Sequence, residues 1–243
     1  MIVLITDFGI RDPYLGQMRA VIQQAAPQTP CITLFPELPA YAVQASAYLL
    51  AAYIHEFPVG TVFLCVVDPG VGTERTPVVI ELDDRWFIGP DNGLFDVIKA
   101  RANRFQQWRI TYRPNECSDT FHGRDIFAPV AASLAKGGSV PGKLMTTEAI
   151  ITREWPDDLL KIVYTDHFGN AITGLRGIRV STADQFDFSG RELSYARTFA
   201  EVDTGQAFWH INANGLVEFS MNQANLAQEL KAVVGDEFTW IHS

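Results

Sequence analysis

The feature of the sequence that most constrains its fold is a set of apolar runs of strand length, several of them rich in β-branched residues. They occupy residues 2–5, 62–67, 78–82, 86–88 and 162–164. Because consecutive positions are apolar, these runs indicate strands that are buried on both faces. Two stretches with helical periodicity, residues 14–25 and 43–54, separate the first two runs. The order strand, helix, helix, strand predicts an α/β layer architecture.

The pattern changes in a polar connector that runs from Pro141 to Pro156. Beyond it, short strand-like runs are separated by single glycines, and a helical pattern returns only at residues 222–232. Such runs are typical of a small barrel or sandwich. We therefore predict an α/β domain over residues 1–150 and a smaller, mainly β domain over residues 160–243.

The composition excludes several classes of partner. The chain has 243 residues with 19 Lys and Arg against 28 Asp and Glu, a formal charge of −9. We therefore expect neither nucleic acid nor an anionic membrane surface as a partner. The first apolar run reaches an acid after six residues, which is too short for a signal peptide or a membrane span. The three cysteines, an odd number without CxxC spacing, predict neither disulfides nor a zinc site and favour a cytoplasmic location.

Three of the apolar runs end on an aspartate, namely Asp7, Asp68 and Asp166. In open α/β sheets, ligands bind at the edge where the carboxyl ends of the strands meet. We expect the three acids to gather at one such edge and to contribute to a site. Each acid taken alone also fits a turn former or a helix cap.

Two further segments carry candidate catalytic groups. The segment VVDPGVGTER places Arg75 seven residues after Asp68 across a glycine-containing turn, which fits either a structural ion pair or part of a site. The segment lacks the third glycine of the dinucleotide fingerprint, and the chain has no Walker lysine motif. The segment TFHGRDIFAP places His122 before an apolar helical stretch. There it can act as a general base or orient one, or it is a structural histidine satisfied by the Asp125 carboxylate or a backbone carbonyl.

The segment DHFGNAITGL contains an acid, an aromatic residue and an amide within five residues, from Asp166 to Asn170. A carboxylate accepts from ribose hydroxyls, an aromatic ring stacks on a base, and an amide reads donor and acceptor pairs on a purine edge. The segment therefore fits a nucleoside site. A tight turn closed by Asn170 explains the same residues equally well.

In chain order, the motifs ITDFG, DPGVGTER, GPDNGLF, TFHGRDIFAP and DHFGNAIT make the sequence similar to the S-adenosylmethionine hydroxide adenosyltransferase family. That family is related to fluorinating and chlorinating enzymes that use the same substrate. The resemblance extends over nearly the whole chain and is most specific up to about residue 175. It implies hydrolysis of S-adenosyl-L-methionine at C5′ of its ribose to adenosine and L-methionine.

The resemblance also implies roles for individual residues. Its hydrolytic members carry an Asp, Arg and His set that corresponds to Asp68, Arg75 and His122, which would align and activate one water molecule. We expect no metal ion and no cofactor to be required. The resemblance further implies a homotrimer, with each site formed by the first domain of one subunit and the second domain of its neighbour.

The remaining positions implied by the resemblance hold the substrate. Asp7 is expected to bind the ribose hydroxyls, and Asp166 to be a second contact to the ribose or the amino-acid part. Asn170 is expected to meet the adenine, while Tyr41 forms an aromatic wall and Phe199 stacks on the base.

Three other functions remain open at this level. Halide-dependent adenosyl transfer would use the same scaffold, and a module that binds S-adenosylmethionine or adenosine would need no turnover. Without the resemblance, the acidic strand ends also fit the magnesium site of a phosphohydrolase.

Overall fold

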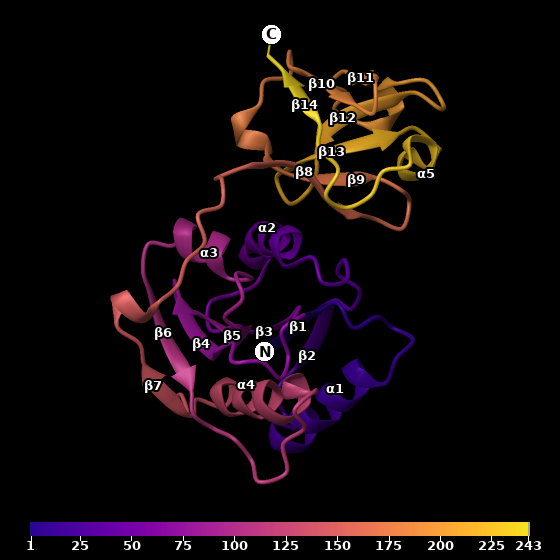
Figure 1. Ribbon diagram of the computed structural model, residues 1–243. Helices are drawn as coiled ribbons and strands as arrows, with labels where there is room; N and C mark the ends of the chain where they lie inside the picture. Colours follow the sequence, from indigo (N-terminus) through magenta and orange to yellow (C-terminus); the bar gives the residue numbers. More distant parts are fainter. Residues whose placement is uncertain (243) are drawn as a thin grey trace. The chain divides into compact units, whose positions relative to one another are not determined.

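The computed structural model describes residues 1–242, which form two compact units (Figure 1). One unit comprises Met1–Ala47 and His55–Trp155, and the other comprises Tyr48–Ile54 and the chain from Pro156 onward. The first is a mixed sheet with helices, and the second is built mainly of antiparallel strands. The predicted fold class is confirmed.

The elements follow one another along the chain. The strands are β1 (Ile2–Thr6), β2 (Cys31–Phe35), β3 (Val62–Val66), β4 (Pro77–Leu82), β5 (Arg85–Pro90), β6 (Phe105–Ile110), β7 (Gly142–Leu144), β8 (Leu159–Thr165), β9 (Ala171–Arg176), β10 (Gln185–Phe188), β11 (Arg191–Leu193), β12 (Ala207–Ile211), β13 (Leu216–Met221) and β14 (Thr239–Ile241). The helices are α1 (Tyr14–Ala25), α2 (Val43–Tyr53), α3 (Asp96–Arg101), α4 (Ala128–Ala135) and α5 (Leu226–Leu230), with short 3₁₀ turns at Ile54–Glu56, Thr147–Ala149, Gly177–Arg179 and Phe199–Glu201 and a π-helical turn at Gly123–Phe127.

The first unit is organised around a seven-stranded sheet of order β2-β1-β3-β5-β4-β6-β7. Strands β2, β1, β3 and β5 are parallel, whereas β4, β6 and β7 run antiparallel to their neighbours. Every residue of β1 and β3 is buried, as their continuous apolar sequences require. Helices α1 and α4 pack together against one face of the sheet, and α3 lies on the other side (Figure 1).

The second unit contains a four-stranded antiparallel sheet, β12-β13-β9-β8, and a three-stranded sheet, β11-β10-β14. Its core is rich in aromatic side chains, among them Phe186, Trp209 and Phe219. The helical pattern expected over residues 222–232 yields only the short α5. Asn225 caps the start of this helix by accepting from the Gln228 amide, and Lys231 ends it in the left-handed conformation.

Candidate functional site

The carboxyl ends of β1 and β3 bring two of the predicted acids together. These strands are parallel neighbours with Thr6 opposite Val66, so Asp7 and Asp68 leave the same edge of the sheet. Asp166 follows β8, which belongs to the four-stranded sheet of the other unit. The expectation that all three acids gather at one edge is therefore wrong for Asp166, because strands of different sheets share no edge.

The turn after β3 brings Asp68 and Arg75 face to face. The Arg75 Nε lies 3.0 and 2.9 Å from the two carboxylate oxygens, and Nη2 lies 2.5 Å from Oδ2. Both side chains are less than one-tenth exposed. Within this turn Gly72 has a φ of +81°, and a Cβ there would stand 2.9 Å from the Asp119 carbonyl oxygen. Glycine therefore allows both the turn and its close approach to the neighbouring loop.

His122 completes a cluster with this ion pair. It stands at the start of the π-helical turn Gly123–Phe127, a type of distortion common at functional sites. Its Nδ1 lies 2.8 Å from Arg75 Nη2. Asp125 pairs instead with Arg124. The alternative in which Asp125 satisfies His122 is therefore wrong, and the histidine joins Arg75 across 47 positions of sequence.

The contact between Arg75 and His122 fixes the proton on the imidazole. A guanidinium has no lone pair to accept with, so Nδ1 of His122 accepts and Nε2 carries the hydrogen. Burial, and then the positive charge of Arg75, lower the pKa of His122 below its ordinary value, which favours this neutral form.

Two buried atoms of this cluster have no hydrogen-bond partner among the described residues, namely Arg75 Nη1 and His122 Nε2. Both are hydrogen-bond donors. Leaving a buried donor unpaired costs about 1 to 3 kcal/mol, so these two donors favour contact with a further group. That group must accept hydrogen bonds.

A cavity of about 420 Å³ adjoins the cluster in the same unit. Aromatic rings make up part of its wall, with Phe8, Tyr14 and Phe121 in mutual contact at centroid distances of 5.4 to 5.9 Å. Asp68 and His122 also line it. The cavity therefore combines a largely apolar wall with charged groups on one side.

Asp7 holds the backbone of Tyr41 beside this edge of the sheet. Its Oδ2 accepts from the Tyr41 amide at 3.0 Å. Burial raises the pKa of Asp7, and the nearby charge of Asp68 adds to the rise. Tyr41 adopts a φ of +63°, and its side chain is 75% exposed. Asp7 and Tyr41, both predicted as substrate contacts, are therefore neighbours in the structure.

The second unit has a cavity of its own, of about 770 Å³. Asp166, Asn170 and Phe199, three of the predicted contacts, line it together with Phe168 and residues 221–225. Phe168 and Phe199 are 73% and 40% exposed, which is unusual for phenylalanine and leaves two ring faces available for stacking. Phe168 is the aromatic residue of the segment from Asp166 to Asn170 that fits a nucleoside site, although it is not among the residues predicted to contact the substrate.

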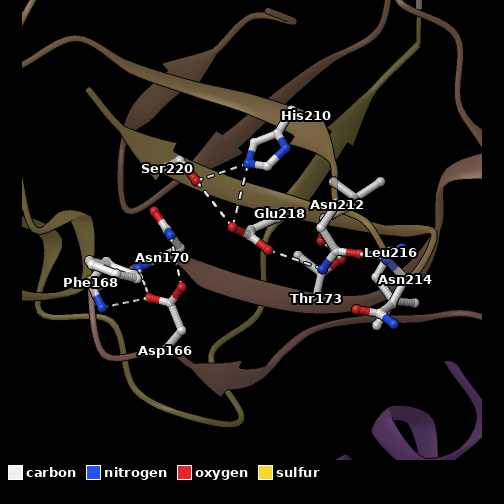
Figure 2. A network of polar contacts seen from close by, with 11 residues as sticks. Asp166, Phe168, Asn170, Thr173, His210, Asn212, Asn214, Leu216, Glu218 and Ser220 are labelled. Carbon is white, nitrogen blue, oxygen red and sulfur yellow. Dashed lines mark hydrogen bonds and ion pairs between the residues drawn. The ribbon is translucent and has the colours of Figure 1, made fainter. Parts of the chain in front are cut away.

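A polar network lies beside this cavity on β12 and β13 (Figure 2). The Nε2 of His210 lies 3.1 Å from Ser220 Oγ and 3.4 Å from Glu218 Oε1, while Asn212 donates to Glu218 Oε2 at 3.0 Å. Burial alone would raise the pKa of Glu218, but hydrogen bonds from His210 and Asn212 outweigh it and leave the pKa below its ordinary value. The His210 ring also packs 5.6 Å from Phe199 and so supports the cavity wall.

Within residues 1–242, no group of three or more His, Cys, Asp or Glu side chains is arranged to hold a metal ion. Across the same residues, no helix combines the length and the apolarity that crossing a membrane requires.

Known proteins resemble this chain over nearly its full length. A curated relative from Thermus thermophilus, named (R)-S-adenosyl-L-methionine hydrolase, is 34% identical over 94% of each chain. A relative of the same name from Salinispora arenicola is 31% identical over 96% of this chain and 94% of its own. A crystal structure of an uncharacterized conserved protein from Thermotoga maritima covers the whole of both chains with a TM-score of 0.89 and 30% identity.

Models of protein families give the same assignment in two parts. The SAM hydroxide adenosyltransferase N-terminal domain matches residues 2–142, and the corresponding C-terminal domain matches residues 160–239. The chain therefore belongs to the SAM hydroxide adenosyltransferase family.

Proposed function

We propose that this protein hydrolyses S-adenosyl-L-methionine at C5′ of the ribose to give adenosine and L-methionine. The names of its relatives support this reaction. The observation that carries the proposal is the pair of buried, unpaired donors on Arg75 and His122 beside an aromatic cavity.

The two donors suit the oxygen of the nucleophile. In the proposed reaction His122, which lines the cavity, and Arg75, which contacts His122, donate to that oxygen and so stabilise negative charge on it. Bulk water has a pKa of about 15.7, so making hydroxide is the difficult part of the reaction. His122 acts as a donor in this arrangement, because Arg75 already engages its remaining lone pair.

The proposed reaction requires one proton acceptor. Oxygen forms a bond to C5′, the carbon–sulfur bond breaks, and the electron pair leaves with sulfur as a neutral thioether. The proton of the attacking water passes to a carboxylate, and we assign this role to Asp68 because it is the acid joined directly to the donor cluster.

The cavity also favours the charge change in this reaction. The attacking oxygen carries negative charge and the sulfonium carries positive charge, so charge is dispersed in the transition state. Water stabilises the separated charges more than the transition state. An aromatic wall that excludes bulk water therefore lowers the barrier.

The proposed substrate contacts come from the edge of the first sheet beside Asp7 and from the cavity of the second unit. Asp7 holds the ribose hydroxyls and Tyr41 forms a wall beside it, as their hydrogen bond permits. Asn170 and Phe199 hold the adenine, with Asp166 in the same cavity. S-adenosyl-L-methionine is thus the small-molecule partner, and no cofactor takes part.

The assembly is part of the proposal. We infer a homotrimer in which the first domain of one subunit and the second domain of its neighbour share each site, and we place the enzyme in the cytoplasm. Asp68 and His122 line one cavity, and three predicted contacts line another, which supports a shared site. A fully active monomer in light scattering combined with activity assays would contradict it.

One observation favours a second reaction. Two unpaired donors hold a halide ion as well as an oxygen, so halide-dependent adenosyl transfer is the alternative use of this cluster. Asp68 and His122 favour hydrolysis, because the family resemblance implies other residue types at these positions in the fluorinating relative.

Hydrolysis in oxygen-18 water separates these reactions. We expect solvent oxygen on the 5′-hydroxyl of adenosine and none in methionine, in buffer free of halide. Unlabelled adenosine, or a requirement for chloride, would contradict direct hydrolysis. Binding without formation of adenosine would identify a binding module, and loss of activity with a chelator would indicate a metal-dependent reaction.

A further inference from the structure

We propose that Asp166 is a positioning residue that makes the site select a 6-amino purine over a 6-oxo purine. It does so by fixing the orientation of the Asn170 side-chain amide. This inference rests on the proposed function, because it concerns the base of the same substrate. It assigns Asp166 a task within the protein in addition to the predicted contact with the ribose or the amino-acid part.

The carboxylate of Asp166 is occupied by its own loop (Figure 2). Its Oδ1 accepts from the backbone amides of Phe168 at 2.9 Å and Asn170 at 2.8 Å. Its Oδ2 accepts from Asn170 Nδ2 at 2.9 Å. Three donors within four residues therefore use most of the acceptor capacity of this carboxylate.

The hydrogen bond to Oδ2 determines which way the Asn170 amide faces. An ionised carboxylate only accepts, so the atom of Asn170 that faces it must be the nitrogen. The planar amide then directs Oδ1 away from Asp166, as Figure 2 shows. Oδ1 and the second hydrogen of Nδ2 have no partner among the described residues, so one acceptor and one donor stay available.

This pair of groups matches one kind of purine edge. In adenine an exocyclic amino group stands beside a ring nitrogen that accepts, and an asparagine amide binds both at once. In a 6-oxo purine the exocyclic group is an acceptor, which would face the acceptor Oδ1. Because Asp166 prevents the amide from turning over, Asn170 cannot adapt to that base.

The position of the amide is fixed by packing as well. Asn170 is buried, and its loop lies against the start of α5, where the Ala227 amide donates to the Gly169 carbonyl at 2.9 Å. Gly169 has a φ of +86°, and a Cβ there would overlap the side chain of Asn225. The loop therefore holds one conformation. Within it, the hydrogen bond to Asp166 determines which of its two orientations the Asn170 amide adopts.

The substitution Asp166→Asn should reverse the orientation of the Asn170 side-chain amide. The two backbone amides still require an acceptor at the position of Oδ1, so the new side chain places its oxygen there and its NH₂ group toward Asn170. Asn170 must then turn its own oxygen toward position 166. Its NH₂ group then faces the exocyclic position of the base, where it pairs with the oxygen of a 6-oxo purine and opposes the amino group of a 6-amino purine.

Binding of adenosine and inosine to the full-length protein tests the inversion, measured by calorimetry at neutral pH. We expect the wild type to prefer adenosine by about tenfold to a hundredfold, and Asp166→Asn to lose or reverse that preference. Hydrolysis of S-adenosyl-L-methionine and of its inosyl analogue should show the same change in the ratio of kcat/KM.

Two controls make the result decisive. Asp236→Asn removes a comparable carboxylate, which accepts the Val233 amide at 2.9 Å outside the cavity, and should leave the preference unchanged. Asn170→Ala should weaken adenosine binding and abolish the preference without reversing it. If Asp166→Asn weakens both nucleosides by the same factor, Asp166 has only a structural role and the inference is wrong. Absence of adenosine formation by the wild type would instead overturn the proposed function.

Discussion

The two cavities of this protein use their polar groups in opposite ways. Beside the cavity of the first unit, two buried donors of Arg75 and His122 are left unpaired. Beside the cavity of the second unit, the carboxylates of Asp166 and Glu218 are each engaged by donors of their own loop or sheet. Groups that act on a reacting atom need donors that are free to bind that atom. Groups that bind a base recognise it better when other hydrogen bonds fix their orientation.

The comparison predicts that substitutions in the first cavity affect turnover and those in the second affect binding. Arg75→Ala is the strongest test, because Arg75 contacts Asp68, His122 and the proposed nucleophile. We expect kcat to fall by roughly 10³-fold or more, while adenosine affinity changes little. Chromatography of adenosine measures the first quantity and calorimetry the second.

The matched variant Arg75→Lys keeps the charge but lacks the planar fork of donors, so it should recover little of the lost turnover. Circular dichroism must show that both variants fold, because removing one partner of the buried ion pair costs about 3 to 5 kcal/mol. A folded Arg75→Ala enzyme with kcat within tenfold of the wild type would remove the cluster from the mechanism.

His122→Ala removes one of the two donors. We expect kcat to fall by roughly 10²- to 10³-fold with adenosine affinity preserved. Because Arg75 and His122 act on one oxygen, the double variant should be little worse than Arg75→Ala alone. His55→Ala, an exposed histidine away from the cavity, is the control, and strictly additive losses would argue against a shared nucleophile.

Phe199→Ala tests the other side of the comparison. Loss of a ring that stacks on a base costs about 1 to 3 kcal/mol, so we expect KM and the Kd for adenosine to rise by about fivefold to a hundredfold. The kcat value at saturation should stay within about threefold of the wild type. Val233→Ala, an exposed position outside the cavity, serves as control, and a fall in kcat at unchanged KM would contradict the assignment.

The pH dependence of kcat/KM is the smallest expected effect, and it tests whether His122 acts in its neutral form. Its pKa lies below the ordinary value of 6.5, so the imidazole stays neutral at that pH and above it. Protonation at lower pH places a hydrogen on Nδ1 and breaks the contact with Arg75. We expect the contribution of His122 to kcat/KM to be constant above pH 6.5 and to be lost as the pH falls through the lowered pKa, and the acid limb attributable to His122 should be absent in His122→Gln.

Much of the first unit could be predicted because its central strands are buried on both faces. The continuous apolar runs predicted β1 and β3. Asp7 and Asp68 lie near each other because these two strands are parallel neighbours. Strand β6 was not predicted, because its sequence FQQWRI has neither a continuous apolar run nor a regular alternation of polar and apolar positions. A single sequence gives no direct signal for such pairing partners.

The site was less accessible to prediction than the fold. The turn that joins Asp68 to Arg75 is local and was anticipated, including the use of glycine. The contact between Arg75 and His122 depends on how two distant loops approach each other, which no spacing encodes. Asp166 was assigned to the wrong edge because an aspartate after a strand does not reveal to which sheet that strand belongs.

The left-handed backbone conformation of Tyr41 allows its side chain to vary with little effect on the stability of the fold. A non-glycine residue at φ +63° carries about 1 to 2 kcal/mol of strain, and its exposed ring recovers little of this by burial. Replacement by glycine would relieve the strain but would cost about 0.5 to 1 kcal/mol through the greater freedom of the unfolded chain. Because the cost offsets about half of the relief, even this replacement would change the stability of the enzyme by only about 1 kcal/mol, so the side chain at this position can vary to fit a different substrate.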